Sequence, residues 1–429
     1  MIPVESQLRD STTIRRSDLF DIAVTGIGLA TPLGLGCSLN VDRLLAGDSA
    51  ITTEIPAGVD SQAIASARCP DFDVSSLLRF PKSLKYMSRA VQLAMRAAIE
   101  AFETSGLERG QIDPYRLSVY TASGQTGLDY TEFSRALDLA WGSDRQPDFG
   151  FIGGTPTRLI DPYFSLRTLG NGGAALISTE FGAKGPSNNF VHSDTAPALA
   201  LQAACLDIVE GRADAAIVGG FESLLYPTAL FALSEAGILT DDARDSHKLV
   251  PAEGAAFFVL ERRDAALDRG AEVLAEILGV ECSLEPPVRN PELSSARSLR
   301  RLMGRLPDQC RSFHFAVSPG GAPGWPVASA LGEVPVVTML RSTGYLGAAT
   351  AAVELALGLL SARQGFVPSI APAAECNDGG VATPGKTSSA IDTLDPTGIF
   401  FSHSRSGQIA AIAARAWSTE RKVFGACAP

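Results

Sequence analysis

Residues 182–223 read GAKGPSNNFVHSDTAPALALQAACLDIVEGRADAAIVGGFES, and this stretch decides the fold. A Gly-Pro-Ser turn precedes a predicted strand over 188–192, and Asp194 and Thr195 stand where a helix N-cap belongs. A helix that is apolar on most of its surface follows, and residues 213–220 read as a buried strand. A turn at a helix N-terminus favours negative charge and often holds a catalytic nucleophile. Here the residue at the turn is Asp194.

Length and composition exclude several classes of protein. A chain of 429 residues that is 45% apolar and 19% charged can bury a large core, and its net charge of −11 argues against nucleic acid as the main partner. No apolar run reaches the roughly 18 residues of a membrane-spanning helix. The N-terminal residues are polar and lack the apolar segment of a signal peptide, so we expect a loose tail over 1–19.

The cysteines and histidines argue against metal chemistry. The seven cysteines are scattered without a CxxC pair, which is typical of reduced thiols in a cytoplasmic protein. The four histidines form no pair with the spacing of helical metal ligands. The glycines of residues 26–36 have the wrong spacing for a nucleotide-binding fingerprint, and Pro32 interrupts the helix that should follow. We therefore expect neither a metal nor a cofactor.

Buried strands alternate with helices along the chain, which predicts an α/β protein with helices packed around largely buried sheets. A single helix is predicted over 162–182, and 407–417 reads as a strand-like or mixed run. Residues 294–306 predict an amphipathic helix with an arginine face, which is either solvated or a site for an acidic protein partner. Further helices are predicted at 39–47, 83–105, 128–141 and 347–365, and further strands at 20–28, 117–122, 254–260, 312–318, 334–340 and 399–403.

Several segments, in order, resemble the β-ketoacyl synthases of the thiolase-like superfamily over about residues 20–418. They are VTGIGLATPLGLG at 24–36, the helix at 83–107, PYFSLRTLGNGGAALISTEFGAKGPS at 162–187, PAEGAAFFVLERRDAALDRGAEVLAEILG at 251–279 and VPVVTMLRSTGYLGAATAAVELALGLL at 334–360. The resemblance implies a five-layered α-β-α-β-α fold made of two similar halves. We expect these halves at 20–262 and 263–429.

The resemblance also shows which chemical groups have changed. Condensing members of the family use a cysteine, two histidines and a nearby lysine. By position, the cysteine falls on Asp194, the first histidine near Ser318, the second on Tyr345 and the lysine on Leu340. The family's late glycine-rich gate corresponds to SHSRSGQI at 402–409, with Arg405 near the position of the gating phenylalanine.

These replacements predict loss of condensation. A carboxylate is a weak acyl nucleophile, and Tyr345 cannot act as a neutral imidazole near pH 7. Asp194 either has a structural role as an N-cap or helps to hold an occluded pocket. Cys205 lies about three turns into its helix and is expected in the core. His192 and Ser193 are neighbours in a strand and point to opposite faces, so they should not form a hydrolytic set.

A ketosynthase-like chain without these groups resembles the chain length factor, the β subunit of type II polyketide synthases. The resemblance implies a non-catalytic subunit that pairs with a catalytic ketosynthase subunit and receives the growing chain from acyl carrier protein. That class commonly has glutamine at the cysteine position, and Asp194 departs from this. The alternatives are a stand-alone decarboxylase or acyltransferase of unusual mechanism, and a module that only binds acyl chains or carrier protein.

In the resembling heterodimers the helix after the SGQTG turn lines the tunnel for the growing chain. That helix corresponds to 128–141 here. Each candidate has ordinary packing as its alternative, because an apolar stripe on a helix is more often core. The candidates for the tunnel wall are Gln125, Tyr130, Phe133, Ser134, Leu137 and Phe164.

Overall fold

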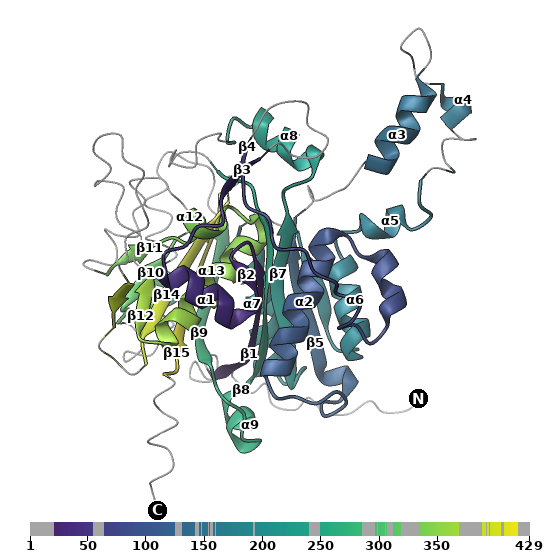
Figure 1. Ribbon diagram of the computed structural model, residues 1–429. Coiled ribbons are helices and arrows are strands. Elements are labelled where there is room, and N and C mark those ends of the chain that lie inside the picture. The colour runs from purple at the N-terminus through teal and green to yellow at the C-terminus, as the bar shows by residue number, and fades with distance from the viewer. Residues whose placement is uncertain are drawn as a thin grey trace, which may run out of the picture.

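The structure is a computed structural model in which layers of helices and strands pack into one body (Figure 1). It describes residues 21–54, 64–124, 131–141, 160–191, 194–239, 249–284, 312–318, 334–368, 388–391, 395–404 and 407–418, with short pieces at 146, 148–152, 154, 158, 297, 299–304, 306 and 393. Within these ranges no helix has the length and apolar content needed to cross a bilayer.

The main sheet has eleven strands in the order β11-β10-β14-β15-β9-β1-β8-β7-β5-β6, with β2 paired to β1. The β5, β6 and β7 strands run parallel to one another, as do β10, β11 and β14, and the strands between these groups pair antiparallel. The bounds are β1 Ile22–Thr31, β2 Gly34–Leu35, β5 Leu117–Ser123, β6 Ser187–Phe190, β7 Ala215–Ser223, β8 Glu253–Arg262, β9 Ala275–Leu284, β10 Phe315–Val317, β11 Val336–Val337, β14 Thr397–His403 and β15 Gln408–Ala416.

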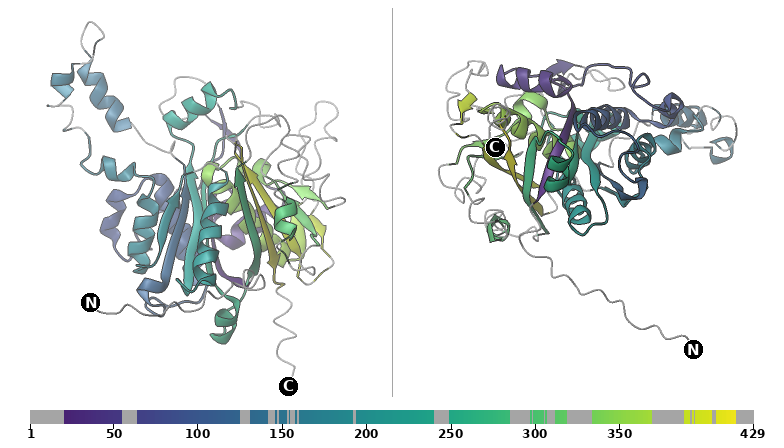
Figure 2. Two further views of the ribbon diagram at one scale, coloured as in Figure 1. Left: turned by 180° about the vertical axis from the view of Figure 1, so that it is seen from behind. Right: turned by 90° about the horizontal axis from the view of Figure 1, so that it is seen from below.

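Two central helices divide this sheet into two arrays. The β1 strand pairs with β9 over only Ile22–Val24, and beyond that point the arrays separate around α7 (Ala196–Val209) and α13 (Thr350–Arg363) (Figures 1 and 2). Both helices contact strands of both arrays. On the outer faces, α2 (Arg89–Thr104) and α6 (Gly172–Phe181) cover the first array, and residues 299–304 pack on the second. This arrangement confirms the predicted thiolase-like α/β fold.

Shorter elements connect and extend these layers. They are α1 Cys37–Leu45, β3 Thr52–Glu54, β4 Ile64–Ser66, η2 Pro81–Tyr86, η3 Pro114–Arg116, α3 Thr131–Ala140, α4 Phe149–Ile152, α5 Phe164–Arg167, α8 Pro227–Glu235, α9 Arg263–Asp268, α12 Leu340–Thr343, η6 Gly347–Ala349, β12 Phe366–Pro368 and β13 Ser388–Ala390. Figures 1 and 2 show α3 and α4 standing away from the layered body, beyond α5.

Two predicted helices have the wrong bounds. The helix predicted from residue 83 begins at Arg89, because the Ser88 hydroxyl accepts a hydrogen bond from the N–H of Val91 and ends the 3-10 turn before it. The single helix predicted over 162–182 is two helices, α5 and α6, separated by a turn at 168–171. The run at 407–417, predicted to be strand-like or mixed, is the strand β15 between β9 and β14.

Gly26 and Gly28 allow α2 to pack closely on β1. The α2 helix lies directly on β1, and a Cβ atom built on Gly28 would lie 2.0 Å from the carbonyl oxygen of Ala97. No side chain fits in that space, so glycine is required for the helix backbone to approach the strand.

We therefore expect Gly28→Ala to lower the free energy of unfolding by about 1–3 kcal/mol, because α2 must move away from β1. Urea denaturation of the purified protein measures this change. Gly304→Ala is the matched control, since no atom lies within 4 Å of its added Cβ. A Gly28→Ala protein as stable as this control would contradict the proposed close packing.

Candidate functional site

The turn before α7 lies between the two arrays. The structure corrects one prediction here: the N-cap of α7 is Thr195, whose side chain makes no capping hydrogen bond, and Asp194 precedes it. The Thr195 hydroxyl lies 3.4 Å from Oε1 of Gln408, which belongs to the segment expected at the family's gate. Asp194 is half-buried. A carboxylate thus stands beside the positive end of a buried helix, without being its cap.

A second acid, Glu354, faces the same turn from α13. Its side chain is 2% exposed, and Oε1 lies 3.3 Å from the N–H of Met339 and 3.4 Å from the hydroxyl of Thr338. Burial raises the pKa of Glu354 to about 8, and the charge of Asp194 contributes to the same rise. The site therefore contains two neighbouring acids in a region of low dielectric.

Two other positions at which the resemblance places catalytic groups, Ser318 and Leu340, lie on adjoining segments. Ser318 is buried at the end of β10, and its N–H donates to the carbonyl of Val337. Leu340 is the first residue of α12 and follows directly after the residues that contact Glu354. The structure thus brings Asp194, Glu354 and the segment at 338–340 together.

Tyr345 is held in place by its backbone. Its N–H donates to the carbonyl of Val250 at 2.7 Å, and its carbonyl accepts from the N–H of Ala252 at 2.9 Å. These bonds connect the segment after α12 to the start of β8. His192, Ser193 and Arg405 lie outside the described residues.

Cys205 packs against the main core from α7, as predicted, and burial raises the pKa of its thiol to about 12. A thiol with such a pKa is a poor nucleophile at neutral pH. In the described part of the chain, no three histidine, cysteine or acidic side chains gather in a way that could hold a metal ion.

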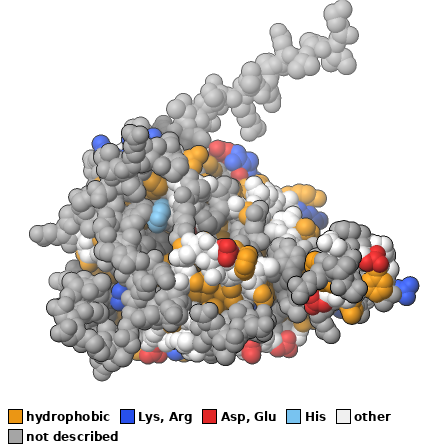
Figure 3. Space-filling model, turned by 90° about the horizontal axis from the view of Figure 1, so that it is seen from above, with side chains coloured by type: hydrophobic (Ala, Val, Ile, Leu, Met, Phe, Trp, Pro, Cys, Tyr) orange, Lys and Arg blue, Asp and Glu red, His pale blue; other side chains and the backbone are white. Residues whose placement is uncertain are grey.

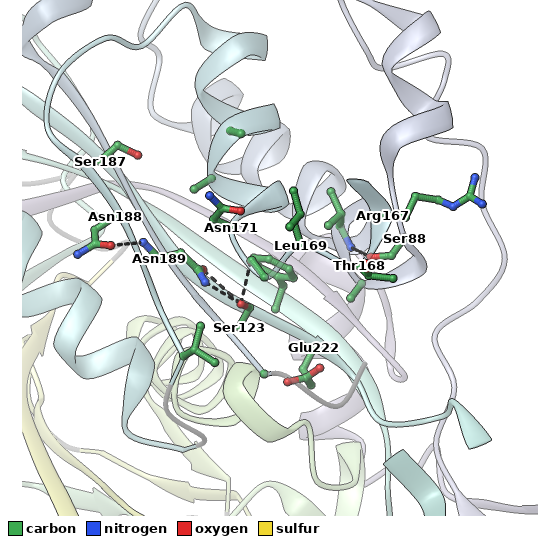
Figure 4. Close-up of a pocket in the computed structure, with 18 residues that line it drawn as sticks. Ser88, Ser123, Arg167, Thr168, Leu169, Asn171, Ser187, Asn188, Asn189 and Glu222 are labelled. Carbon is green, nitrogen blue, oxygen red and sulfur yellow. Dashed lines mark hydrogen bonds between the residues drawn. The ribbon is translucent and has the colours of Figure 1, made fainter. Parts of the chain in front are cut away.

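A cavity of about 710 Å³ opens at the carboxyl ends of the parallel strands β5, β6 and β7 (Figure 4). Such an edge is where ligands bind in α/β sheets, because the loops that follow the strands diverge there. Its wall combines the end of β5, the β6 strand, the turn at 167–171 and the start of α2. This volume lies within the usual range for a site that holds a small molecule.

Glu222 closes one side of this cavity from the end of β7. Its side chain is 3% exposed, and burial raises its pKa to about 8, although nearby backbone N–H groups of Ser223, Gly124 and Ala348 lower it in part. A Cβ atom on Gly124 would lie 1.5 Å from Oε2 of Glu222. The carboxyl therefore occupies space that only a glycine leaves open.

The predicted tunnel residues lie elsewhere in the single chain. Gln125 and Tyr130 are outside the described residues, and Phe133 and Leu137 belong to α3, where their side chains are not described. Ser134 is exposed on the same helix, and Phe164 is half-buried at the start of α5. Neither of these two lines the cavity at β5, β6 and β7. Their assignment to a tunnel stays a prediction.

Sequence reasoning missed Glu222, Glu354, Asn189 and Ser123. The signal for two of them was present, because Ser123 and Glu222 stand at the carboxyl ends of strands that the sequence predicted, whereas Asn189 lies within its strand. Glu354 had no such signal, since an acid inside an apolar helix can be placed only when the neighbours of that helix are known.

Two arrays of strands pack around two buried helices, and the turn before one of these helices, α7, carries Asp194. This architecture defines a thiolase-like protein of the ketosynthase type. The family model "Beta-ketoacyl synthase, N-terminal domain" matches residues 20–266. The chain belongs to the β-ketoacyl synthase family.

Curated relatives and solved structures agree with this family. The chain is 29% identical over 377 residues to the tetracenomycin polyketide synthase ketoacyl synthase beta subunit of Streptomyces glaucescens, which covers 81% of this chain and 87% of the relative. It is 33% identical over 276 residues to the putative polyketide beta-ketoacyl synthase 1 of Streptomyces cyaneus, which covers 60% of this chain but only 62% of that relative.

Among solved structures, the ishigamide ketosynthase/chain length factor aligns with a TM-score of 0.75 and 21% identity over 92% of this chain and 98% of that chain. A beta-ketoacyl synthase from Burkholderia phymatum aligns with a TM-score of 0.74 and 19% identity, covering 92% of this chain and 99% of that chain. At these identities the structures establish the fold.

The raised pKa of Glu222 predicts a pH-dependent stability. The unfolded carboxyl loses its proton near pH 4.5 and the folded one near pH 8, so stability falls as pH rises through this window. In Glu222→Gln this dependence is absent. We therefore expect the melting temperature of the variant to rise relative to that of the wild type as the pH increases from about 5 to about 8. Thermal unfolding at several pH values measures the difference.

The exposed acid Glu103 on α2 provides the control, because Glu103→Gln removes a carboxyl that faces water. A difference in melting temperature between Glu222→Gln and the wild type that stays the same from pH 5 to pH 8 would refute the raised pKa, whatever the variant's stability at pH 5.

Proposed function

We propose that the chain is a non-catalytic chain length factor that pairs with a catalytic ketosynthase subunit in a type II polyketide synthase. The observation that carries this proposal is the turn before α7, where Asp194 and the neighbouring acid Glu354 lie between the two arrays. The relative from Streptomyces glaucescens is the beta subunit of a polyketide synthase, which supports the same role.

Electrostatics explains why the site at the start of α7 does not suit condensation. Decarboxylative condensation develops negative charge on a thioester enolate, and a catalyst must offer hydrogen-bond donors or positive charge there. The charge of Asp194 would instead repel that of the enolate, and repulsion is strong where water is largely excluded. Ser318 and Tyr345 supply no imidazole to offset it.

An exposed apolar arm supports pairing with another subunit. We use the name arm for α3, α4 and α5 with the turn that follows α5, and Figure 3 shows apolar side chains on its outer part, to the right of the body. Large exposed apolar groups that face water usually mark an interaction surface. They are Leu139 (58% exposed), Trp141 (51%), Phe151 (42%), Leu166 (43%) and Leu169 (51%).

The edge of the main sheet supports the same surface. Among the described residues β6 pairs with β5 on one side only, so it ends the sheet. An open strand edge accepts another strand, and a partner of the same fold carries a matching edge. Leu169 of the arm and Ser187 of β6 both line the cavity, so a subunit bound to the arm and to β6 would cover it.

We infer that this covered cavity belongs to the tunnel for the growing polyketide, which the ketosynthase subunit receives from acyl carrier protein. One solved neighbour is a type II PKS acyl-carrier protein in complex with its ketosynthase bound to the hexaketide, which supports that donor. The tunnel wall proposed from the resemblance comprises Gln125, Tyr130, Phe133, Ser134, Leu137 and Phe164. In a complex, the partner would complete the path between this wall and the cavity.

Co-expression with a ketosynthase subunit tests the pairing. We expect a heterodimer in size-exclusion chromatography, and we expect Leu139→Asp with Trp141→Asp to weaken it at least tenfold, because each change places a charge in an apolar contact. Leu267→Asp is the matched control, since Leu267 is also exposed (46%) but lies on α9, away from the arm. A stable monomer, or a homodimer that ignores the ketosynthase, would overturn the proposal.

Product analysis tests the tunnel wall. We expect Phe133→Ala to enlarge the tunnel and to shift the polyketide to a greater carbon count, which mass spectrometry of the heterodimer's products measures. The heterodimer must form as well as that of the wild type, so that a change in length is not a failure of pairing. An unchanged product length would exclude Phe133 from the wall.

A further inference from the structure

A second cavity, of about 480 Å³, lies at the opposite end of β5 from the first. Leu117, the first residue of β5, lines this second cavity, whereas Ser123, the last residue of the same strand, lines the first. A strand of this length spans roughly 20 Å, so the two cavities are well separated. The volume of the second cavity is within the usual range for a site that holds a small molecule.

Two phenylalanines form the floor of the second cavity. Phe102 comes from the last turn of α2 and Phe181 is the final residue of α6, and each is only 6% exposed. Because α2 and α6 pack against one another, the two ring centroids lie 4.6 Å apart, with 31° between the ring planes. The cavity therefore offers a fixed aromatic surface on which a flat ring can pack.

A guanidinium group lies over this aromatic floor. The Arg109 guanidinium is 5.1 Å from the centroid of the Phe181 ring, and its Nη2 lies 2.8 Å from Oε1 of Glu180. Its Nη1 donates to the carbonyl oxygen of Glu180 at 2.5 Å. Arginine has five N–H donors, so these two bonds leave others for a ligand. The ring and Glu180 together hold the donors of Arg109 in position.

The charges around the second cavity favour an anion. Glu180 is 2% exposed, and its carboxylate is already satisfied by Arg109 and by the backbone N–H of Arg79, at 2.9 and 3.1 Å. The Arg79 guanidinium instead lies 5.1 Å from the centroid of the Phe80 ring, and no carboxylate of the described residues forms an ion pair with it. Glu108 also lines the cavity, but it is exposed, and water screens its charge.

We propose that the second cavity binds an aromatic carboxylate. Its ring packs on Phe102 and Phe181, and its carboxylate accepts hydrogen bonds from Arg109 and is attracted by the charge of Arg79. An uncharged apolar ligand would cover the donors of Arg109 without replacing their bonds to water, and a small inorganic anion would leave the rings in contact with water. All of these residues belong to this chain, so the proposal does not depend on pairing with a ketosynthase subunit.

Calorimetry on the purified full-length chain tests the class of ligand. Three probes are compared: 2-naphthoate, 2-naphthamide, which keeps the rings without the charge, and decahydro-2-naphthoate, which keeps the charge without the aromatic rings. We expect 2-naphthoate to bind at least about fivefold more tightly than either of the others. A chain that does not bind 2-naphthoate, or that binds another probe as tightly, would overturn the proposal.

Two substitutions of opposite effect test the position of the carboxylate. We expect Arg79→Gln to weaken the binding of 2-naphthoate at least about threefold and Glu108→Gln to strengthen it about twofold, because they remove opposite charges at the cavity. Neither change should alter the affinity for 2-naphthamide. Both side chains are exposed, so the fold is retained. Arg109 is kept, because its loss would leave Glu180 buried without its cation.

Lys184→Gln is the matched control for these substitutions. Lys184 is an exposed cation two residues after Gly182, its ammonium lies 5.4 Å from the centroid of the Tyr115 ring, and it does not line the cavity. Its loss should leave the affinity for 2-naphthoate unchanged. If Lys184→Gln weakens binding as much as Arg79→Gln, or if Glu108→Gln also weakens it, the carboxylate does not lie at the arginines and the proposal fails.

Discussion

The structure depends on the burial of two helices, α7 and α13, between two arrays of strands. Each array needs apolar cover on its inner face, so both helices must be apolar around most of their surface. Nearly every residue of α13 is buried, including Glu354 and Arg363. Arg363 is compensated by Glu272 at 2.8 Å and by the carbonyl of Val273. Because the helices pack side by side, Asp194 before α7 lies close to Glu354 in the second turn of α13. This packing determines which side chains surround the start of α7.

The chemistry at the start of α7 is then determined by a few side chains on a fixed backbone scaffold. In this chain, Asp194 and Glu354 lie close together at the start of α7. The scaffold is intact, with its close helix–strand contacts and its open sheet edge at β6. This intact scaffold agrees with the proposed role in assembly and in shaping a cavity.

The cavity and the arm are the two features on which the proposed pairing depends. The turn at 168–171 both ends α5 and carries Leu169 and Gly170 to the wall of the cavity. Its neighbours on β6 present Ser187 and Asn188 to solvent at the edge of the sheet. The polar side chains that line the cavity and the exposed apolar side chains of the arm are therefore separated by only a few residues along the chain.

The sequence by itself determined the alternation of strands and helices, the buried character of α7 and α13 and the identity of the residue at the turn. These follow from local periodicity, which each segment carries alone. The prediction from sequence was wrong about the start of α2, which a capping hydrogen bond determines. It also missed the turn that separates α5 from α6. Only the tertiary structure decided that Ser123, Asn189 and Glu222 share one cavity and that Glu354 faces Asp194. These residues are far apart along the chain, and only the packing of strands and helices brings their side chains together.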